Sequence, residues 1–272
     1  PRRTSRGPDL GRWSAVTTTQ TPTWGEKAAA AAVHAYTASG SVLALLMVER
    51  SYAGDVQAVL WLFLAAMLVD GTDGFLARRF RVKEVIPGFD GALLDNIVDY
   101  MTYVLAPMAL LWANDYLPAG TFGAICAAVP LLASCVQFCR VDAKPVVEGE
   151  HFFLGFPSYW NVLAFYVVAT GLGPGATATV LLVCTVLVFV PIRYVYPSRT
   201  ESRCHLTFVL TPRWFAAYAV IVAQLPDPSD LVVWASVAYL GYYLGLSLRL
   251  TLSKPRSTDG HGWDGLIVAV VG

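Results

Sequence analysis

The most informative residues of this chain are four aspartates that stand beside apolar stretches at helical spacings. Asp70 and Asp73 are three positions apart, and Asp95 and Asp99 are four positions apart. On a helix these spacings place both members of a pair on one face, about 5–6 Å from each other. Carboxylates that close repel unless a cation neutralises them, and each costs about 2.5–3.5 kcal/mol inside a membrane. Because hard oxygen ligands suit Mg²⁺ and Mn²⁺, the pattern predicts a divalent metal site at a membrane face.

The rest of the sequence is apolar enough for a membrane protein. Of its 272 residues, 56% are hydrophobic and 14% are charged, whereas soluble domains carry about 25% charged residues. A membrane-spanning helix needs about 20 mainly apolar residues. Runs near that length occupy residues 28–48, 56–76, 91–112, 118–139, 158–172, 175–195, 206–225 and 231–252. Because these runs are continuous and do not alternate with polar residues, they predict helices and not barrel strands.

These runs predict an all-α fold, a polytopic membrane bundle of about eight transmembrane helices. We expect a flexible cytoplasmic tail over residues 1–27, a membrane-embedded domain over 28–252 and a cytoplasmic tail over 253–272. Basic residues gather in alternate loops, at 78–83, 140–144, 193–213 and 254–256, and the intervening loops are mainly acidic. The positive-inside rule then places both tails and the aspartates on the cytoplasmic side. The net charge of zero argues against a nucleic-acid partner.

The aspartates belong to a longer pattern, D-x2-D-G-x2-A-R followed by G-x3-D-x3-D. It resembles the signature of the CDP-alcohol phosphotransferases, integral membrane enzymes of phospholipid synthesis. The eight signature positions are occupied here by Asp70, Asp73, Gly74, Ala77, Arg78, Gly91, Asp95 and Asp99. The resemblance implies that 28–252 is a catalytic domain with the core helices of that family.

The resemblance also implies a role for each signature residue. Asp70, Asp73 and Asp95 would ligate two Mn²⁺ or Mg²⁺ ions. Asp99 would take the proton of the acceptor alcohol and also contact a metal ion. The nucleotide and its pyrophosphate would be bound by Asp70, Gly74, Ala77, Arg78 and Gly91. The alternative for the two glycines is close packing of helices through small residues.

Three further features resemble the branch of this family that makes phosphatidylcholine in bacteria. They are the long spacer of residues 79–90, the motif His34-x-x-Thr37-Ala-Ser-Gly40 and the run 151–161. The resemblance implies transfer of the phosphatidyl group of CDP-diacylglycerol to choline, with release of CMP. It further implies a homodimer among the lipids of the bacterial cytoplasmic membrane, with its active site facing the cytoplasm.

Choline carries a quaternary ammonium group, which is best held by aromatic faces. Candidate choline-binding residues are Tyr100, Tyr103, Glu150, Tyr159, Trp160 and Asn161. The alternative for each aromatic residue is membership of the interfacial aromatic belt of a membrane protein.

Two other functions compete with this interpretation. The acceptor could be glycerol phosphate or inositol phosphate, whose phosphate needs cations such as Arg140 or Arg193. The chain could also be a cation transporter with aspartates along an ion path. A transporter ranks well below the enzyme, because the aspartates cluster around one helix–loop–helix near one membrane face.

Overall fold

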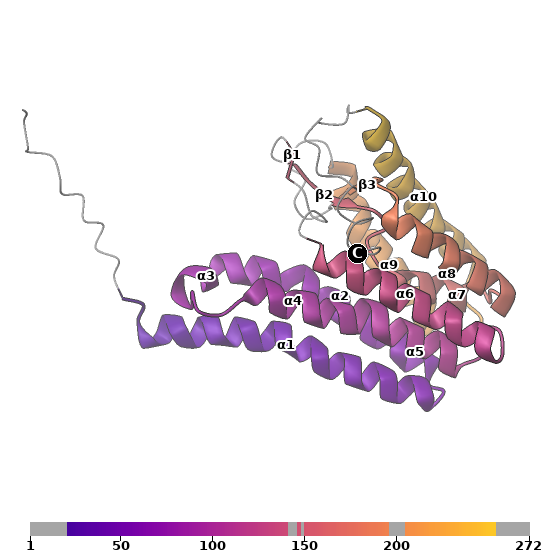
Figure 1. Ribbon diagram of the computed structural model, residues 1–272, viewed down its shortest axis with the longest axis horizontal. Helices are drawn as coiled ribbons and strands as arrows, with labels where there is room; N and C mark the ends of the chain where they lie inside the picture. Colours follow the sequence, from indigo (N-terminus) through magenta and orange to yellow (C-terminus); the bar gives the residue numbers. More distant parts are fainter. Residues whose placement is uncertain (1–20, 141–145, 148–149, 196–204, 254–272) are drawn as a thin grey trace, which may run out of the picture.

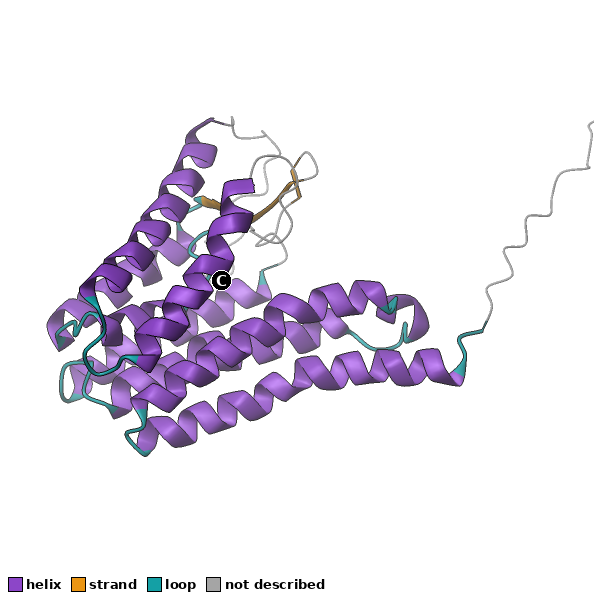
Figure 2. Ribbon diagram, turned by 180° about the vertical axis from the view of Figure 1, so that it is seen from behind, coloured by secondary structure: helices purple, strands orange, loops and turns teal. Residues whose placement is uncertain are grey.

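The computed structural model describes residues 21–140, 146–147, 150–195 and 205–253, and helices dominate it (Figures 1 and 2). The helices are α1 (Trp24–Tyr52), α2 (Val56–Arg79), α3 (Val82–Val85), α4 (Gly91–Asp99), the π-helix η1 (Tyr100–Leu105), α5 (Ala106–Ala113), α6 (Thr121–Cys139), α7 (Trp160–Ala169), α8 (Pro174–Phe189), α9 (His205–Ala223) and α10 (Asp230–Ser253). Each of the eight predicted spans overlaps one of these helices or, for 91–112, the unbroken stretch α4–η1–α5. The prediction of a helical membrane bundle is therefore confirmed.

Four of the described helices are long and apolar enough to cross a membrane: α1, α2, α6 and the first part of α10. Shorter apolar helices occupy 160–169, 174–189 and 209–223. The chain is thus a multi-pass membrane protein. In Figure 1, α1, α2, the α4–η1–α5 stretch and α6 run alongside one another. The helix α8 packs against α6, and α9 and α10 pack against each other.

Two predicted boundaries differ from the structure because of local capping and proline. The first helix begins at Trp24, inside the predicted tail 1–27, since Thr23 and Glu26 form a reciprocal capping box. The sixth predicted span was to reach residue 195, but α8 ends at Phe189. Pro191 follows shortly afterwards, and proline cannot continue a helix. Most of the predicted tails, 1–20 and 254–272, lies outside the described residues.

A small sheet was missed by the sequence analysis. Strands β1 (Val146–Val147), β2 (Glu150–Leu154) and β3 (Arg193–Val195) pair antiparallel in that order, with Phe153 opposite Tyr194. The sheet joins the segment before α7 to the segment after α8. The predicted fifth span, 158–172, correspondingly contains only the ten-residue helix α7.

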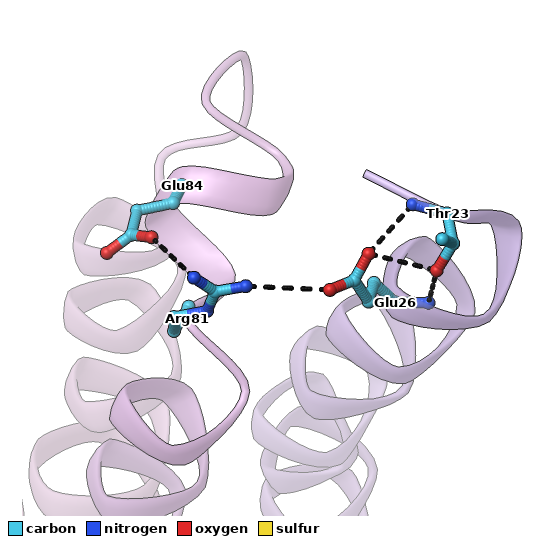
Figure 3. A network of polar contacts seen from close by, with 4 residues as sticks. All are labelled: Thr23, Glu26, Arg81 and Glu84. Atoms are coloured by element: carbon cyan, nitrogen blue, oxygen red, sulfur yellow. Dashed lines mark hydrogen bonds and ion pairs between the residues drawn. The ribbon is translucent and has the colours of Figure 1, made fainter. Parts of the chain in front are cut away.

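The spacer between the two aspartate pairs is fastened to the first helix by a polar network (Figure 3). The guanidinium group of Arg81 lies 3.5 Å from a carboxylate oxygen of Glu26 on α1 and 3.6 Å from one of Glu84. Glu26 also accepts hydrogen bonds from the backbone N–H and the hydroxyl of Thr23. Exposed ion pairs contribute little stability, so apolar packing beneath them holds the spacer. That packing joins Ala30, Val33, Val82 and Val85.

Gly155 shapes the turn between β2 and α7. Its φ of +84° lies in the left-handed region, and a Cβ added to it would lie 2.0 Å from the carbonyl oxygen of Val188 on α8. The N–H of Gly155 donates to the carbonyl of Ile192 at 3.0 Å. Only glycine satisfies both requirements, so this position ties the start of α7 to the end of α8.

We expect Gly155→Ala to destabilise the protein by about 2–5 kcal/mol, because a left-handed backbone costs about 1–2 kcal/mol and steric overlap adds about 1–3. The midpoint of thermal unfolding in detergent measures the loss. Gly171→Ala is the control: Gly171 has φ +60°, but an added Cβ there meets nothing within 4 Å. It should show the backbone cost alone, and equal losses in the two variants would contradict the steric argument.

Candidate active site

The structure brings three of the four signature aspartates together. Asp70 near the end of α2 and Asp95 and Asp99 on α4 each offer a carboxylate oxygen, and these oxygens lie within 4.8 Å of one another. All three side chains are partly buried. The helical spacing of Asp95 and Asp99 aligns them on one face of α4, and packing of α2, α1 and α4 brings Asp70 opposite.

The fourth aspartate lies on the same small cavity but outside the close cluster. Asp73 is 7% exposed, and its Oδ2 accepts a hydrogen bond of 2.8 Å from the hydroxyl of Thr37 on α1. The cavity is lined by Thr37, Gly40, Ala66, Val69, Asp70, Asp73, Asp95, Val98, Asp99 and Thr102. Its volume of about 10 Å³ is roughly the space of one water molecule or ion.

Close packing between α1 and α4 sets the width of this cavity. A Cβ added to Gly40 on α1 would lie 2.4 Å from Cγ1 of Val98, so the two helices approach at glycine. Val98 stands next to Asp99 in the sequence. A larger residue at position 40 would push α4, and with it two of the clustered carboxylates, away from α1.

Two hydroxyl groups donate hydrogen bonds to the aspartates, and these contacts were not predicted from the sequence. Tyr103 donates to Oδ2 of Asp70 at 2.7 Å, and Thr37 donates to Asp73. Tyr103 follows Asp99 by four residues, and on a continuous α-helix this spacing would place it on the face of Asp95 and Asp99, which is a signal for its position. Thr37 has no such signal, since it meets Asp73 only through the packing of α1 on α2.

The signature residues predicted to bind the nucleotide lie around the ends of α2 and α4. Gly74 is half-buried, and a Cβ added to it would meet only the Arg78 guanidinium group at 3.5 Å. Arg78 itself is exposed. A Cβ on Gly91 would lie 3.0 Å from the imidazole of His34 on α1. Ala77 packs against the apolar cluster beneath the spacer. Gly91 thus makes room for a helix contact, as the packing alternative predicts, and Gly74 leaves open space.

Two of the predicted choline-binding aromatic residues lie beside the aspartate cluster. Tyr103 contacts Asp70, and its ring centroid is 6.2 Å from that of Tyr159, the residue that precedes α7. Tyr100, in contrast, turns toward α6: its hydroxyl donates to the carbonyl of Leu131 at 3.0 Å, and its ring meets Phe138 edge-on.

Two of the other predicted choline-binding residues are almost completely buried. The side chain of the third lies outside the described part of the chain. Trp160 is fully buried, and its indole N–H donates to the hydroxyl of Ser134 at 2.7 Å. Asn161 is 1% exposed, and its Oδ1 accepts no hydrogen bond within the described part of the chain. The backbone of Glu150 opens β2, and its side chain lies outside the described part. Their contact with choline stays a prediction.

The donor set of the cluster fits a divalent cation. Three carboxylates within 4.8 Å carry like charges that a hard cation neutralises, and oxygen ligands are those that Mg²⁺ and Mn²⁺ prefer. The neighbouring cavity has room for an ion. The arrangement is suited to phosphoryl transfer, in which positioning and charge neutralisation dominate.

Comparison with known proteins identifies the class of this chain. A family model of the CDP-alcohol phosphatidyltransferases matches residues 32–240, so the chain belongs to this family of enzymes. Similar curated proteins are phosphatidylcholine synthases. That of Legionella pneumophila is 39% identical over 228 residues, covering 80% of this chain and 87% of its own. That of Pseudomonas aeruginosa is 36% identical over 223 residues, covering 82% and 92%. That of Rhizobium johnstonii is 37% identical over 232 residues, covering 83% and 93%.

Proposed function

We propose that this protein transfers the phosphatidyl group of CDP-diacylglycerol to choline, giving phosphatidylcholine and CMP. The observation that carries the proposal is the meeting of Asp70, Asp95 and Asp99 from two helices at one cavity. The choice of choline is supported by the similarity to the phosphatidylcholine synthases.

The carboxylates of Asp70, Asp73, Asp95 and Asp99 would hold Mn²⁺ or Mg²⁺, and we propose two ions. When bound, such ions neutralise the charge of the pyrophosphate and of the departing nucleotide. Asp73 is the least accessible of the four, because Thr37 already occupies one of its oxygens. Asp73 nevertheless lines the cavity.

In the reaction, the hydroxyl oxygen of choline forms a bond to the phosphorus that bears diacylglycerol. The bond from that phosphorus to the bridging oxygen of the pyrophosphate breaks, and CMP leaves with the electron pair. Asp99 accepts the proton of the choline hydroxyl as the new bond forms. Asp99 suits this role, since it lies on the cavity at the end of α4, next to the π-helix.

The nucleotide would lie toward the ends of α2 and α4, against Asp70, Gly74, Ala77, Arg78 and Gly91. Arg78 is exposed there, and its guanidinium fork can pair with the pyrophosphate in a bidentate manner. The open space at Gly74 lets a ligand approach the backbone of α2. The small side chain of Ala77 serves the same purpose one turn later.

The choline ammonium would lie on the side of the cluster that faces α7. Tyr159 is half-buried there, with its ring near Tyr103, and cation–π contact with such a ring is worth about 0.5–2 kcal/mol. Asn161 has a buried amide oxygen that accepts no hydrogen bond from the described residues. Glu150 belongs to the predicted set as well. Tyr100 turns toward α6 and Trp160 is fully buried, so these two are less suited to contact the ammonium group.

We also propose the setting of the enzyme. The catalytic domain would run from α1 to α10 and form a homodimer in the bacterial cytoplasmic membrane, with its active site facing the cytoplasm. The support is the gathering of Arg and Lys next to the aspartate helices, as in 78–83, which the positive-inside rule assigns to the cytoplasmic side.

An acceptor competition tests the proposed substrate. The purified chain is supplied with CDP-diacylglycerol and Mn²⁺, and CMP release is measured with choline, glycerol phosphate or inositol phosphate. We expect release with choline alone, and excess of either phosphorylated alcohol should not inhibit it. Release with a phosphorylated alcohol and none with choline would replace the proposal by the alternative acceptor. Arg140→Gln, at the end of α6, should then abolish that activity.

A further inference from the structure

Tyr103 donates a hydrogen bond to one of the clustered carboxylates. Its phenol hydroxyl lies 2.7 Å from Oδ2 of Asp70, a short distance typical of a hydrogen bond to an ionised acceptor. The Tyr103 side chain is 7% exposed. A buried tyrosine hydroxyl needs a partner, and here that partner is a proposed metal ligand 33 residues earlier in the chain.

The backbone around Tyr103 is unusual. Tyr103 lies in the π-helix η1, in which the N–H of Ala106 donates to the carbonyl of Met101, five residues earlier. Pro107 follows and has no N–H to donate to the carbonyl of Tyr103 four residues before it. A π-helical turn directly after the catalytic helix is a common feature of functional sites. It sets how the Tyr103 side chain is directed relative to Asp95 and Asp99.

We infer that Tyr103 is a positioning residue that fixes the orientation of Asp70 for metal binding and does not bind choline. This inference rests on the proposed metal site. A carboxylate that is held at one oxygen keeps its orientation, so Asp70 presents itself to Asp95 and Asp99 at a constant geometry. Partners behind metal ligands typically contribute 10–100-fold to metal affinity or activity. Tyr103 is only 7% exposed, which leaves little of its aromatic face accessible to a quaternary ammonium group.

Mn²⁺ binding to the purified full-length chain, measured by electron paramagnetic resonance without nucleotide or choline, tests this role. We expect Tyr103→Phe, which removes only the hydroxyl, to raise the Mn²⁺ dissociation constant about 10-fold. Tyr218→Phe is the matched control. Tyr218 is likewise a buried tyrosine, and its hydroxyl donates to the backbone carbonyl of Leu60 at 3.0 Å, about 15 Å along α2 from Asp70. The control should bind Mn²⁺ as the wild type does.

The same substitution made in an Asp70→Ala variant distinguishes a positioning role of Tyr103 from general damage to the site. In Asp70→Ala, the carboxylate that Tyr103 holds is gone, so adding Tyr103→Phe should change the Mn²⁺ dissociation constant less than about two-fold. General damage would weaken binding in both backgrounds and overturn the inference. Wild-type Mn²⁺ affinity in Tyr103→Phe would overturn it as well.

The choline dependence provides the last discriminating measurement. At saturating Mn²⁺, the KM for choline of Tyr103→Phe should stay near the wild-type value. A KM about 10-fold higher, with Mn²⁺ affinity intact, would make Tyr103 a choline ligand and overturn the inference. The binding measurement contains no acceptor. A wild-type chain that binds Mn²⁺ but makes no phosphatidylcholine would refute the proposed function and leave the test of Tyr103 unaffected.

Discussion

Asp99→Asn is expected to lower the rate of CMP release by about 10²–10⁴-fold, the usual contribution of a general base. Asparagine keeps the size of the side chain, but it cannot accept the proton of the choline hydroxyl. The rate is measured with saturating choline and saturating Mn²⁺, so that weaker metal binding does not account for the loss.

Asp90→Asn is the matched control for that substitution. Asp90 precedes the same helix, and its carboxylate caps α4 by accepting the N–H groups of Ala92 and Leu93 at 3.1 and 3.0 Å. Asparagine caps a helix about as well as aspartate, so this variant removes the same charge and should keep wild-type activity. If Asp99→Asn retained more than about a tenth of the wild-type rate, Asp99 would not be the general base.

Removal of divalent ions is expected to have the second large effect. Treatment with a strong chelator should abolish CMP release, and added Mn²⁺ or Mg²⁺ should restore it. Metal ions contribute several kcal/mol of charge stabilisation in such sites, which corresponds to a loss of about 10³-fold or more. We expect this dependence on metal ions because the carboxylates of Asp70, Asp95 and Asp99 lie close together and repel one another when no cation is bound.

Thermal unfolding measures the binding of the ion without depending on enzymatic activity. An ion at 100 times its dissociation constant stabilises the folded state by about 2.7 kcal/mol, so the unfolding midpoint should rise when Mn²⁺ is added. In Asp95→Asn the rise should be smaller, because one of the clustered ligands is weakened. Full activity in excess chelator would contradict the metal site and with it the proposed mechanism.

Those features of the protein that depend on local spacing were predictable from the amino-acid sequence. The eight apolar runs predict where helices form, because burial in a membrane requires continuous apolar segments. The i,i+4 spacing of Asp95 and Asp99 predicts that they share a face of α4, because helical geometry alone decides it. The signature pattern also predicted the family, which the match over 32–240 confirms.

The boundaries that were wrong have physical causes at short range. The capping box at Thr23 and Glu26 starts α1 early, and the chain after Phe189 leaves the helix for strand β3. Strands of two to five residues carry too little periodicity to be recognised in an apolar sequence. The pairing of β2 with β3 also joins residues more than 35 positions apart.

The amino-acid order by itself was enough to predict the membrane bundle and the family, because helical period and apolar length act between near neighbours. It also indicates four aspartates for the proposed site. The folded arrangement was needed to show that Asp70, Asp95 and Asp99 meet while Asp73 stands apart. It was also needed to find the hydroxyl groups of Thr37 and Tyr103 behind two of these carboxylates. These contacts join residues 33 to 36 positions apart, and only the packing of α1, α2 and α4–η1 against one another determines them.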